Sequence, residues 1–485
     1  MAGFNRDGAD LAKDRRAFIG DRGASTGRDN PSSRRTADPE AGGYVPPSPL
    51  EWMIAVFAVV IQQAAFVWVP LLLAGGPISD VGEVPNPYNT VTISLSGLAV
   101  GILCFIHYRK IVPLIWQNPA SILLVIIIIA SSLWSIHPEL TFRRSNNYIV
   151  TMLTAVYLSG RFATGEAIKV LSWGLALSAI GSFLFVVVYP GYGIMQDTPD
   201  LAGNWRGVFI HKNQLGWVMA VGVFVECYIL ASAPPHRGRH LALLIAFFVL
   251  VAFSRSTTAL LSSVFYLSGA GIYLLWARAR AIAPIISVAL ALLGLTTLVA
   301  FWDDPGAALA WLGKDATLTG RAELWAEVPN LIAERPLLGW GYEATWQPND
   351  NATIYIWNIL GWDPPSAHNA LLEVTLQLGL TGLVVVLAVI AVALWRSIGC
   401  FSAGLHHLGA FSLLFFLVTI YSGVTEAVLA QNQSIPWVAF NILSLSCGLE
   451  VAQVKAHHKQ KQERIGTTIL SRTEPLGETG IAPKR

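Results

Sequence analysis

The chain has 485 residues, of which 54% are hydrophobic and only 13% charged, and its mean hydropathy is +0.53. This composition lies outside the range of soluble globular proteins and predicts an integral membrane protein. The net charge of +2 gives no basic excess, which argues against a nucleic-acid partner. The cysteines lie far apart, inside or beside apolar segments, so we expect packing residues rather than a disulfide framework or a metal site.

Residues 1–50 lack apolar periodicity and predict a disordered tail. The apolar segments that follow are long enough to cross a bilayer, and they predict an all-α integral membrane protein with about 12 transmembrane helices. We expect a bundle over residues 51–302, a large loop over 303–368, more bundle over 369–452 and a tail over 453–485. The predicted spans are 52–74, 90–107, 120–136, 147–160, 169–189, 214–234, 241–254, 259–277, 281–302, 370–395, 408–422 and 434–452.

An even number of spans places both tails on one side, and the distribution of Lys and Arg selects that side. The side that holds the tails carries 24 of the 32 basic residues, so both tails are predicted to be cytoplasmic. The tails supply most of this bias. The loop of residues 303–368 is then extracytoplasmic, and the basic residues on its side are candidates for binding an anion or for snorkelling at the membrane surface.

The segment Arg206 to Trp217 ends one outer loop and begins the sixth predicted span. Arg206 next to a glycine can bind phosphate oxygens through its guanidinium, and His211, Lys212 and Asn213 add donors at a helix start. The alternative is a polar cap on an ordinary span. Arg255, in the short turn Ser254-Arg255-Ser256, could reach a central cavity or contact lipid headgroups, and the sequence does not separate these.

Residues 317–342 predict an amphipathic helix in the large loop. Arg321 and Arg335 share its apolar face, whereas the glutamates lie on the opposite face, and Pro329 predicts a kink or a break. Such a helix suits the mouth of a site for a lipid-linked substrate. Snorkelling beside the apolar face would produce the same pattern.

The tenth predicted span opens with His368, Asn369, Glu373 and Gln377. The last three have a spacing of four, which gives one polar stripe that should face the bundle interior. A histidine at the outer surface is suited to proton transfer, although a histidine at a span end is often only interfacial. The aromatic residues between 340 and 362 could stack on sugars or form an interfacial belt.

These motifs, in this order, resemble the O-antigen ligase and Wzy-type polysaccharide polymerase family, and within it the ExoQ-like exopolysaccharide polymerases. The resemblance extends from about residue 120 to 450. It rests on Arg206-Gly207, Ser254-Arg255-Ser256, Thr319-Gly320-Arg321 with Trp325, Arg335-Pro336-Leu337-Leu338-Gly339 with Gly341, and His368-Asn369 followed by Gly379 and Gly382.

The resemblance implies a glycosyltransferase of the bacterial inner membrane that acts on glycans carried by undecaprenyl diphosphate. It implies no cofactor, nucleotide sugar or metal, and partners among lipids and other polysaccharide-assembly proteins. The family's arginines and outer-loop histidine carry over to Arg206, Arg321 and His368 as catalytic residues. Substrate contacts would come from the other polar residues of the motifs, which are Arg255, His211, Lys212, Asn213, Asn369, Glu373 and Arg335.

The chemistry of these residues agrees with that role. Fixed arginines stabilise a leaving diphosphate, His368 takes the proton of the acceptor hydroxyl or orients it, and Glu373 or Asn369 could hold the imidazole. A one-step displacement would invert the anomeric carbon. We favour a polymerase, with a ligase that transfers the glycan to lipid A core as the alternative. A transporter of lipid-linked glycans is a third hypothesis. Glu226, a charged residue inside the sixth predicted span, is the one residue that supports it. A scaffold is the least favoured.

Overall fold

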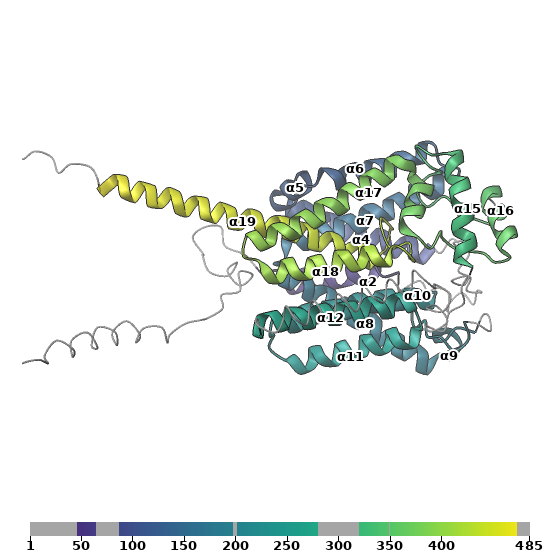
Figure 1. Cartoon of the computed structure of the whole chain (residues 1–485), viewed down its shortest axis with the longest axis horizontal. Coiled ribbons are helices and arrows are strands. Elements are labelled where there is room, and N and C mark those ends of the chain that lie inside the picture. The colour runs from purple at the N-terminus through teal and green to yellow at the C-terminus, as the bar shows by residue number, and fades with distance from the viewer. Residues whose placement is uncertain (1–45, 65–86, 197–200, 280–319, 349, 473–485) are drawn as a thin grey trace, which may run out of the picture. The chain divides into compact units, whose positions relative to one another are not determined.

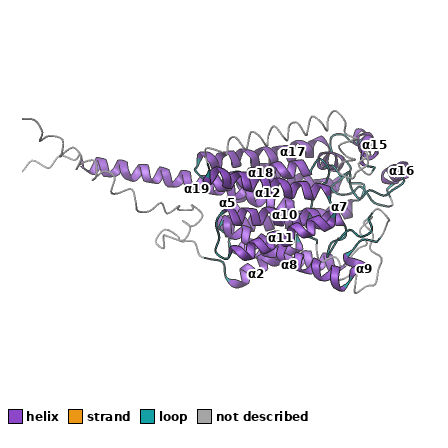
Figure 2. Cartoon of the chain, turned by 60° about the horizontal axis from the view of Figure 1, so that its bottom comes forward, coloured by secondary structure: helices purple, strands orange, loops and turns teal. Residues whose placement is uncertain are grey.

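The computed structural model describes residues 46–64, 87–196, 201–279, 320–348 and 350–472. Within these ranges the chain is helical (Figures 1 and 2), and an isolated antiparallel bridge between Ile194 and Trp205 is the one β-type contact. The helices are α2 (Pro49–Ile61), α4 (Pro87–Ile106), α5 (Tyr108–Trp116), α6 (Pro119–Ala130), η3 (Ser131–Leu133), α7 (Pro138–Arg161), α8 (Thr164–Val188), α9 (Pro190–Gly193), α10 (Lys212–Ala231), α11 (Arg237–Ser254), α12 (Thr257–Arg278), α15 (Arg321–Glu334), α16 (Asn351–Leu360), α17 (Ala370–Ser402), α18 (His406–Ser422) and α19 (Ile435–Arg472).

The predicted class, a helical multi-pass membrane protein, is confirmed. Each predicted span within the described ranges overlaps a helix, and six of these helices are long and apolar enough to cross a membrane. The number becomes seven if α4 and α5, which meet at 98°, form one span, and α2, α6 with η3, and α18 are apolar but shorter. The ninth predicted span, 281–302, and residues 303–319 of the predicted loop lie outside the described residues, so the total of 12 stays a prediction.

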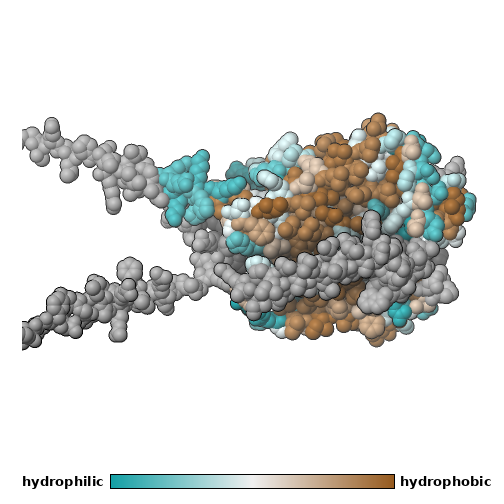
Figure 3. Space-filling view, in the orientation of Figure 1, coloured by the Kyte–Doolittle hydropathy of each residue, from teal (hydrophilic) through white to brown (hydrophobic). Residues whose placement is uncertain are grey.

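The surface of the bundle has the polarity of a membrane protein. Large apolar side chains are exposed along the helices, among them Phe105 at 79%, Val187 at 78% and Trp395 at 77%. Figure 3 shows this hydrophobic surface along the length of the helices, with hydrophilic residues toward their ends. Apolar side chains exposed to this extent are stable next to lipid and costly in water.

The helix starts follow from local sequence. α2, α6 and α7 each have a proline at the first helical position, where the missing N–H costs no hydrogen bond. Ser48 forms a capping box with Glu51, and Asn369 caps α17 by accepting from the N–H groups of Leu371 and Leu372. Capping therefore fixes the start of α17, whose N-cap Asn369 directly follows His368.

The predicted amphipathic helix exists as α15, and its polarity follows the prediction. Leu324, Val328 and Leu331 are buried, whereas Glu323 and Glu334 are exposed. These leucines and Val328 belong to a small second core with Trp340, Trp346, Ile356, Ala367 and Leu376. Of the kink or break predicted at Pro329, the break is wrong, because α15 continues through this residue, and the kink stays a prediction. Packing of the residues on both sides of Pro329 compensates for the one hydrogen bond that proline removes.

Helix α17 contains a backbone irregularity that explains two of the motifs. Gly379 has φ 64° and ψ −168°, so the helical hydrogen bonding is interrupted there. The segment 335–341 fills the gap: the N–H groups of Trp340 and Gly341 donate to the carbonyls of Leu376 and Gln377, and Leu380 N–H donates to Pro336 O. A Cβ on Gly379 would lie 2.2 Å from the backbone of Leu337. Gly339 and Gly379, one from each motif, therefore allow the segment 335–341 and α17 to pack backbone against backbone.

Candidate functional site

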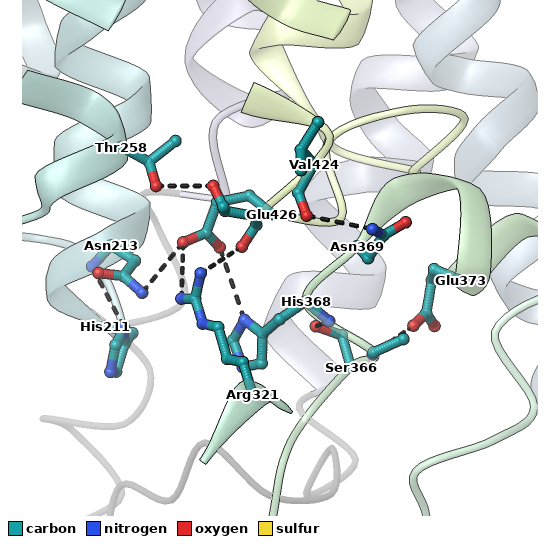
Figure 4. A network of polar contacts seen from close by, with 12 residues as sticks. His211, Asn213, Thr258, Arg321, Ser366, His368, Asn369, Glu373, Val424 and Glu426 are labelled. Carbon is teal, nitrogen blue, oxygen red and sulfur yellow. Dashed lines mark hydrogen bonds and ion pairs between the residues drawn. The ribbon is translucent and has the colours of Figure 1, made fainter. Parts of the chain in front are cut away.

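Five segments that are distant in sequence meet at the end of the bundle that carries α15 and α16 (Figures 1 and 4). They are the starts of α10, α12 and α15, the residues before α17, and the loop between α18 and α19. A single carboxylate, that of Glu426 in the last loop, joins most of them. Glu426 is 7% exposed.

Glu426 contacts a residue from three of these segments. Its Oε1 accepts from Arg321 Nη2 at 3.0 Å and from Asn213 Nδ2 at 3.4 Å. Its Oε2 lies 3.7 Å from His368 Nδ1, which is an ion-pair distance. Burial by itself raises the pKa of Glu426, but the neighbouring His368 and the Arg321 guanidinium outweigh it and hold that pKa below its ordinary value. Glu426 is therefore an anion at neutral pH.

Arg321 is the first residue of α15 and follows Gly320, which has φ +82° and forms the N-cap. Its Nη1 donates to Thr425 O at 2.5 Å, so the guanidinium holds both the backbone and the side chain of the Thr425-Glu426 pair. A guanidinium has five N–H donors in a planar fork. Within the described ranges its two contacts therefore leave N–H groups that could bind an anionic ligand.

His368 has a left-handed backbone, with φ 48°, and its conformation is fixed by its neighbours. Ala367, directly before it, donates its N–H to Glu373 Oε2 at 2.6 Å and accepts from the indole Nε1 of Trp325 at 2.9 Å. The hydroxyl of Ser366 accepts from His368 N–H at 3.2 Å. Strain of this kind persists where the surroundings over-determine it, which is common at functional sites.

The predicted stripe on α17 exists, but its members have different contacts from those expected. Glu373 is buried and accepts from Gln377 Nε2 at 2.6 Å and from Trp346 Nε1 at 3.1 Å. Asn369 donates to Val424 O at 3.1 Å. Neither side chain contacts the imidazole of His368. Glu373 instead supports the backbone before His368, and Glu426 is the carboxylate that faces the ring.

The segment that begins α10 places two predicted residues at the site. His211 is the N-cap of α10, and its Nδ1 accepts from Asn213 N–H at 3.2 Å. Burial lowers the pKa of His211 to about 4, so the ring is neutral and can act as this acceptor. Asn213 reaches Glu426, as given above. Lys212 Nζ donates to Arg255 O at 3.4 Å, away from Glu426.

The other arginines are not gathered with Arg321. Arg206 is buried at 4% exposure and donates Nε to Tyr192 O at 2.7 Å, although its charge acts on the neighbouring His211. The side chain of Arg255 is exposed, in a residue with φ 50°. Arg335 lies 4.4 Å from the ring of Trp340 and donates to Trp134 O.

Glu426 was not predicted from sequence, although a signal was present. It is the one acidic residue between the eleventh and twelfth predicted spans, in a short loop that is otherwise apolar or uncharged. Sequence spacing could not connect it to Arg321, which is 105 residues away. Only the packing of α18 and α19 against α17 brings the two together.

Comparison with known proteins finds a similarity to one family over part of the chain. A model of the O-antigen ligase family matches residues 240–387, a range that includes Arg321 and His368. The predicted resemblance is confirmed, and the chain is a helical multi-pass membrane protein of bacterial polysaccharide assembly. Over 306 residues it is 26% identical to the exopolysaccharide production protein ExoQ of Rhizobium meliloti (strain 1021). The aligned region covers 60% of this chain and 68% of that protein.

Proposed function

We propose that the chain is a membrane glycosyltransferase that polymerises oligosaccharide repeat units carried by undecaprenyl diphosphate into exopolysaccharide or O-antigen. One observation supports this most strongly: Glu426 holds Arg321 and His368 together at one end of the bundle. A fixed cation and an oriented imidazole are the two groups that transfer from a lipid diphosphate requires.

In the proposed reaction, the oxygen of the acceptor hydroxyl attacks the anomeric carbon of the donor sugar. The hydroxyl proton passes to His368 Nε2, which has no hydrogen-bond partner among the described residues, while Nδ1 faces Glu426. The bond from the anomeric carbon to the diphosphate oxygen breaks, and its electron pair leaves with the diphosphate. Displacement in one step inverts the anomeric carbon. Glu426 stabilises the imidazolium, as a carboxylate does in a catalytic triad.

We assign the diphosphate to Arg321, whose guanidinium has more N–H donors than its two contacts within the described part of the chain use. Arg206 stays a second proposed cation, whose side chain must turn from Tyr192 O to reach the diphosphate. His211, Asn213 and Asn369 lie around the same cluster and are proposed substrate contacts. Lys212, Arg255, Arg335 and Glu373 stay weaker proposals, since Lys212 donates to Arg255 O, Arg335 donates to Trp134 O, Glu373 accepts from Ala367 N–H, and the side chain of Arg255 is exposed. No metal or cofactor is proposed.

The membrane arrangement follows the charge distribution. We propose about 12 spans in the bacterial inner membrane, with residues 1–50 and 453–485 cytoplasmic and residues 303–368 in a periplasmic loop. The starts of α10, α15 and α17, which carry or adjoin Asn213, Arg321 and His368, lie at the end of the bundle that carries α15 and α16 (Figure 1), as one extracytoplasmic site requires. Other polysaccharide-assembly proteins are proposed partners.

A ligase is the second candidate, and the name of the matching family model favours it. The name of the relative, an exopolysaccharide production protein, favours a polymerase. The two activities share the donor and differ in the acceptor, which is another carrier-linked unit for a polymerase and lipid A core for a ligase. The residues at Glu426 serve either reaction.

The test is the size distribution of surface polysaccharide in a strain that lacks the gene and carries intact or variant protein. Loss of the intact gene should leave single carrier-linked units for a polymerase, and long chains retained on the carrier for a ligase. We expect His368→Ala to lower the turnover number by about 10²–10⁴-fold and Arg321→Ala by about 10²–10³-fold.

Arg237→Ala, an exposed arginine at the start of α11, is the matched control and should restore normal chains. Normal chain length from His368→Ala and Arg321→Ala proteins at normal abundance would contradict the proposal.

A further inference from the structure

Trp362 lies beside the cluster but belongs to none of its hydrogen bonds. It is in the loop between α16 and α17, and its ring centroid is 6.1 Å from that of His368, with the ring planes tilted by 33°. The residue is partly exposed. Among the described residues its indole N–H has no hydrogen-bond partner, whereas those of Trp325, Trp340, Trp346 and Trp357 each donate to an oxygen.

The backbone next to Arg321 makes room for this ring. The position of a Cβ on Gly320 would be 2.7 Å from Nε1 of Trp362, so any larger residue would displace the indole. Gly320 also has φ +82°, a conformation that costs glycine little. One glycine therefore fixes the start of α15, which carries Arg321, and places an indole between that start and His368.

This placement fits a sugar ring. The face of an indole carries negative charge density, and the C–H groups on one face of a pyranose carry partial positive charge, so the two surfaces attract. A pyranose stacked on the indole directs its equatorial hydroxyl groups outward from its edge. His368, 6.1 Å from the indole, lies within reach of such a hydroxyl.

We propose that Trp362 is the stacking platform for the terminal sugar of the acceptor, and that it places the attacking hydroxyl at His368. This rests on the proposed function. The acceptor rather than the donor is assigned to Trp362, because His368 takes the proton of the acceptor whereas the diphosphate of the donor binds at Arg321. Trp362 is thus a positioning residue that determines acceptor affinity.

The experiment measures chain extension by the full-length protein in lipid nanodiscs. The donor is the carrier-linked repeat unit, and the acceptor is the free repeat-unit oligosaccharide at varied concentration. Trp362→Ala should raise KM for this acceptor about tenfold, equivalent to about 1.4 kcal/mol, and should change kcat less than threefold. Trp362→Phe keeps an aromatic face and should recover most of the affinity. Tyr355→Ala, an aromatic residue of α16 that is 56% exposed, is the matched control and should behave as the intact protein.

An unchanged KM in Trp362→Ala, or a loss of kcat alone, would overturn the platform. If the intact protein extends no chains, the proposed function fails, and saturation-transfer NMR with the same oligosaccharide then tests the platform directly. Binding that disappears in Trp362→Ala and persists in Tyr355→Ala would support the stacking platform. Equal signals in the intact protein and Trp362→Ala, or absence of binding to the intact protein, would reject it.

Discussion

Among the pairs of a carboxylate and an imidazole in the described residues, Glu226–His240 and Glu426–His368 differ most clearly in what surrounds them. Glu226 and His240 are buried between α10 and α11, at 0% and 2% exposure, with Oε2 and Nδ1 2.7 Å apart. Glu426 and His368 are in loops, are more exposed and are 3.7 Å apart. The first pair, the closed pair, is fully buried, whereas the second, which we call the open pair, is partly exposed, with side-chain exposures of 14% for His368 and 10% for Glu426.

The surroundings of the first pair complete its hydrogen bonds. Ser172 donates to Glu226 Oε1 at 2.5 Å, and Arg239 contacts His240 Nε2 at 3.2 Å. Glu226 is the fifteenth residue of α10, about 21 Å along the helix from Lys212. Buried charges whose hydrogen bonds are complete join packed helices. Glu226, the one residue that supported a transporter, therefore has a structural explanation.

The largest effect is expected from breaking the closed pair. Glu226→Ala leaves the hydroxyl of Ser172 and the imidazole of His240 buried without their acceptor, which should cost on the order of 3–5 kcal/mol. Thermal unfolding in detergent measures this loss. Specific activity per folded molecule should stay near that of the intact protein. A stable Glu226→Ala protein with no activity would contradict this, because Glu226 would then be required for activity and not for stability.

Glu426→Gln tests the open pair. The amide keeps the shape but loses the charge that orients His368 and pairs with Arg321, so we expect kcat to fall by about 10²-fold, or about 2.7 kcal/mol. The melting temperature should fall much less than in Glu226→Ala. Activity and melting temperature should be measured in parallel on Glu426→Gln and Glu226→Ala. Equal losses of stability in the two variants would contradict the difference between the two pairs.

Glu373→Gln concerns the carboxylate that supports the backbone before His368. Its three partners, Ala367 N–H, Gln377 Nε2 and Trp346 Nε1, are all donors, so the new amide group opposes one of them. The expected cost is about 1–3 kcal/mol of stability, with a parallel loss of activity. Circular-dichroism melting and chain-extension rates on one preparation test this, and a change in activity without a change in melting would argue for direct contact with substrate.

The smallest effect is expected at His211. Burial lowers its pKa from about 6.5 in the unfolded chain to about 4 in the folded protein, so the unfolded state binds more protons between these values. This contribution to stability is complete above pH 6.5 and is lost progressively as the pH falls to about 4. His211→Asn keeps a helix cap that does not titrate. The melting temperature of the intact protein should therefore fall relative to that of His211→Asn as the pH falls from 6.5 to about 4, and parallel curves would contradict the assignment.

The sequence by itself determined the class of protein, because apolar segments of membrane length and few charges leave no other solution. It also selected Arg321 and His368, since their motifs are local and the helix starts are set by neighbours such as Gly320 and Asn369. The polarity of α15 followed from the 3.6-residue period.

Only the tertiary structure decided which residues meet. Glu426 is 105 residues from Arg321, and no local pattern encodes that contact. The support of Gly379 by residues 335–341, and the separation of Arg255 and Arg335 from the cluster, likewise depend on how α15, α17 and the last two helices pack. Contacts between distant segments arise from packing of whole helices, and a periodic pattern states which face is buried but not against which partner.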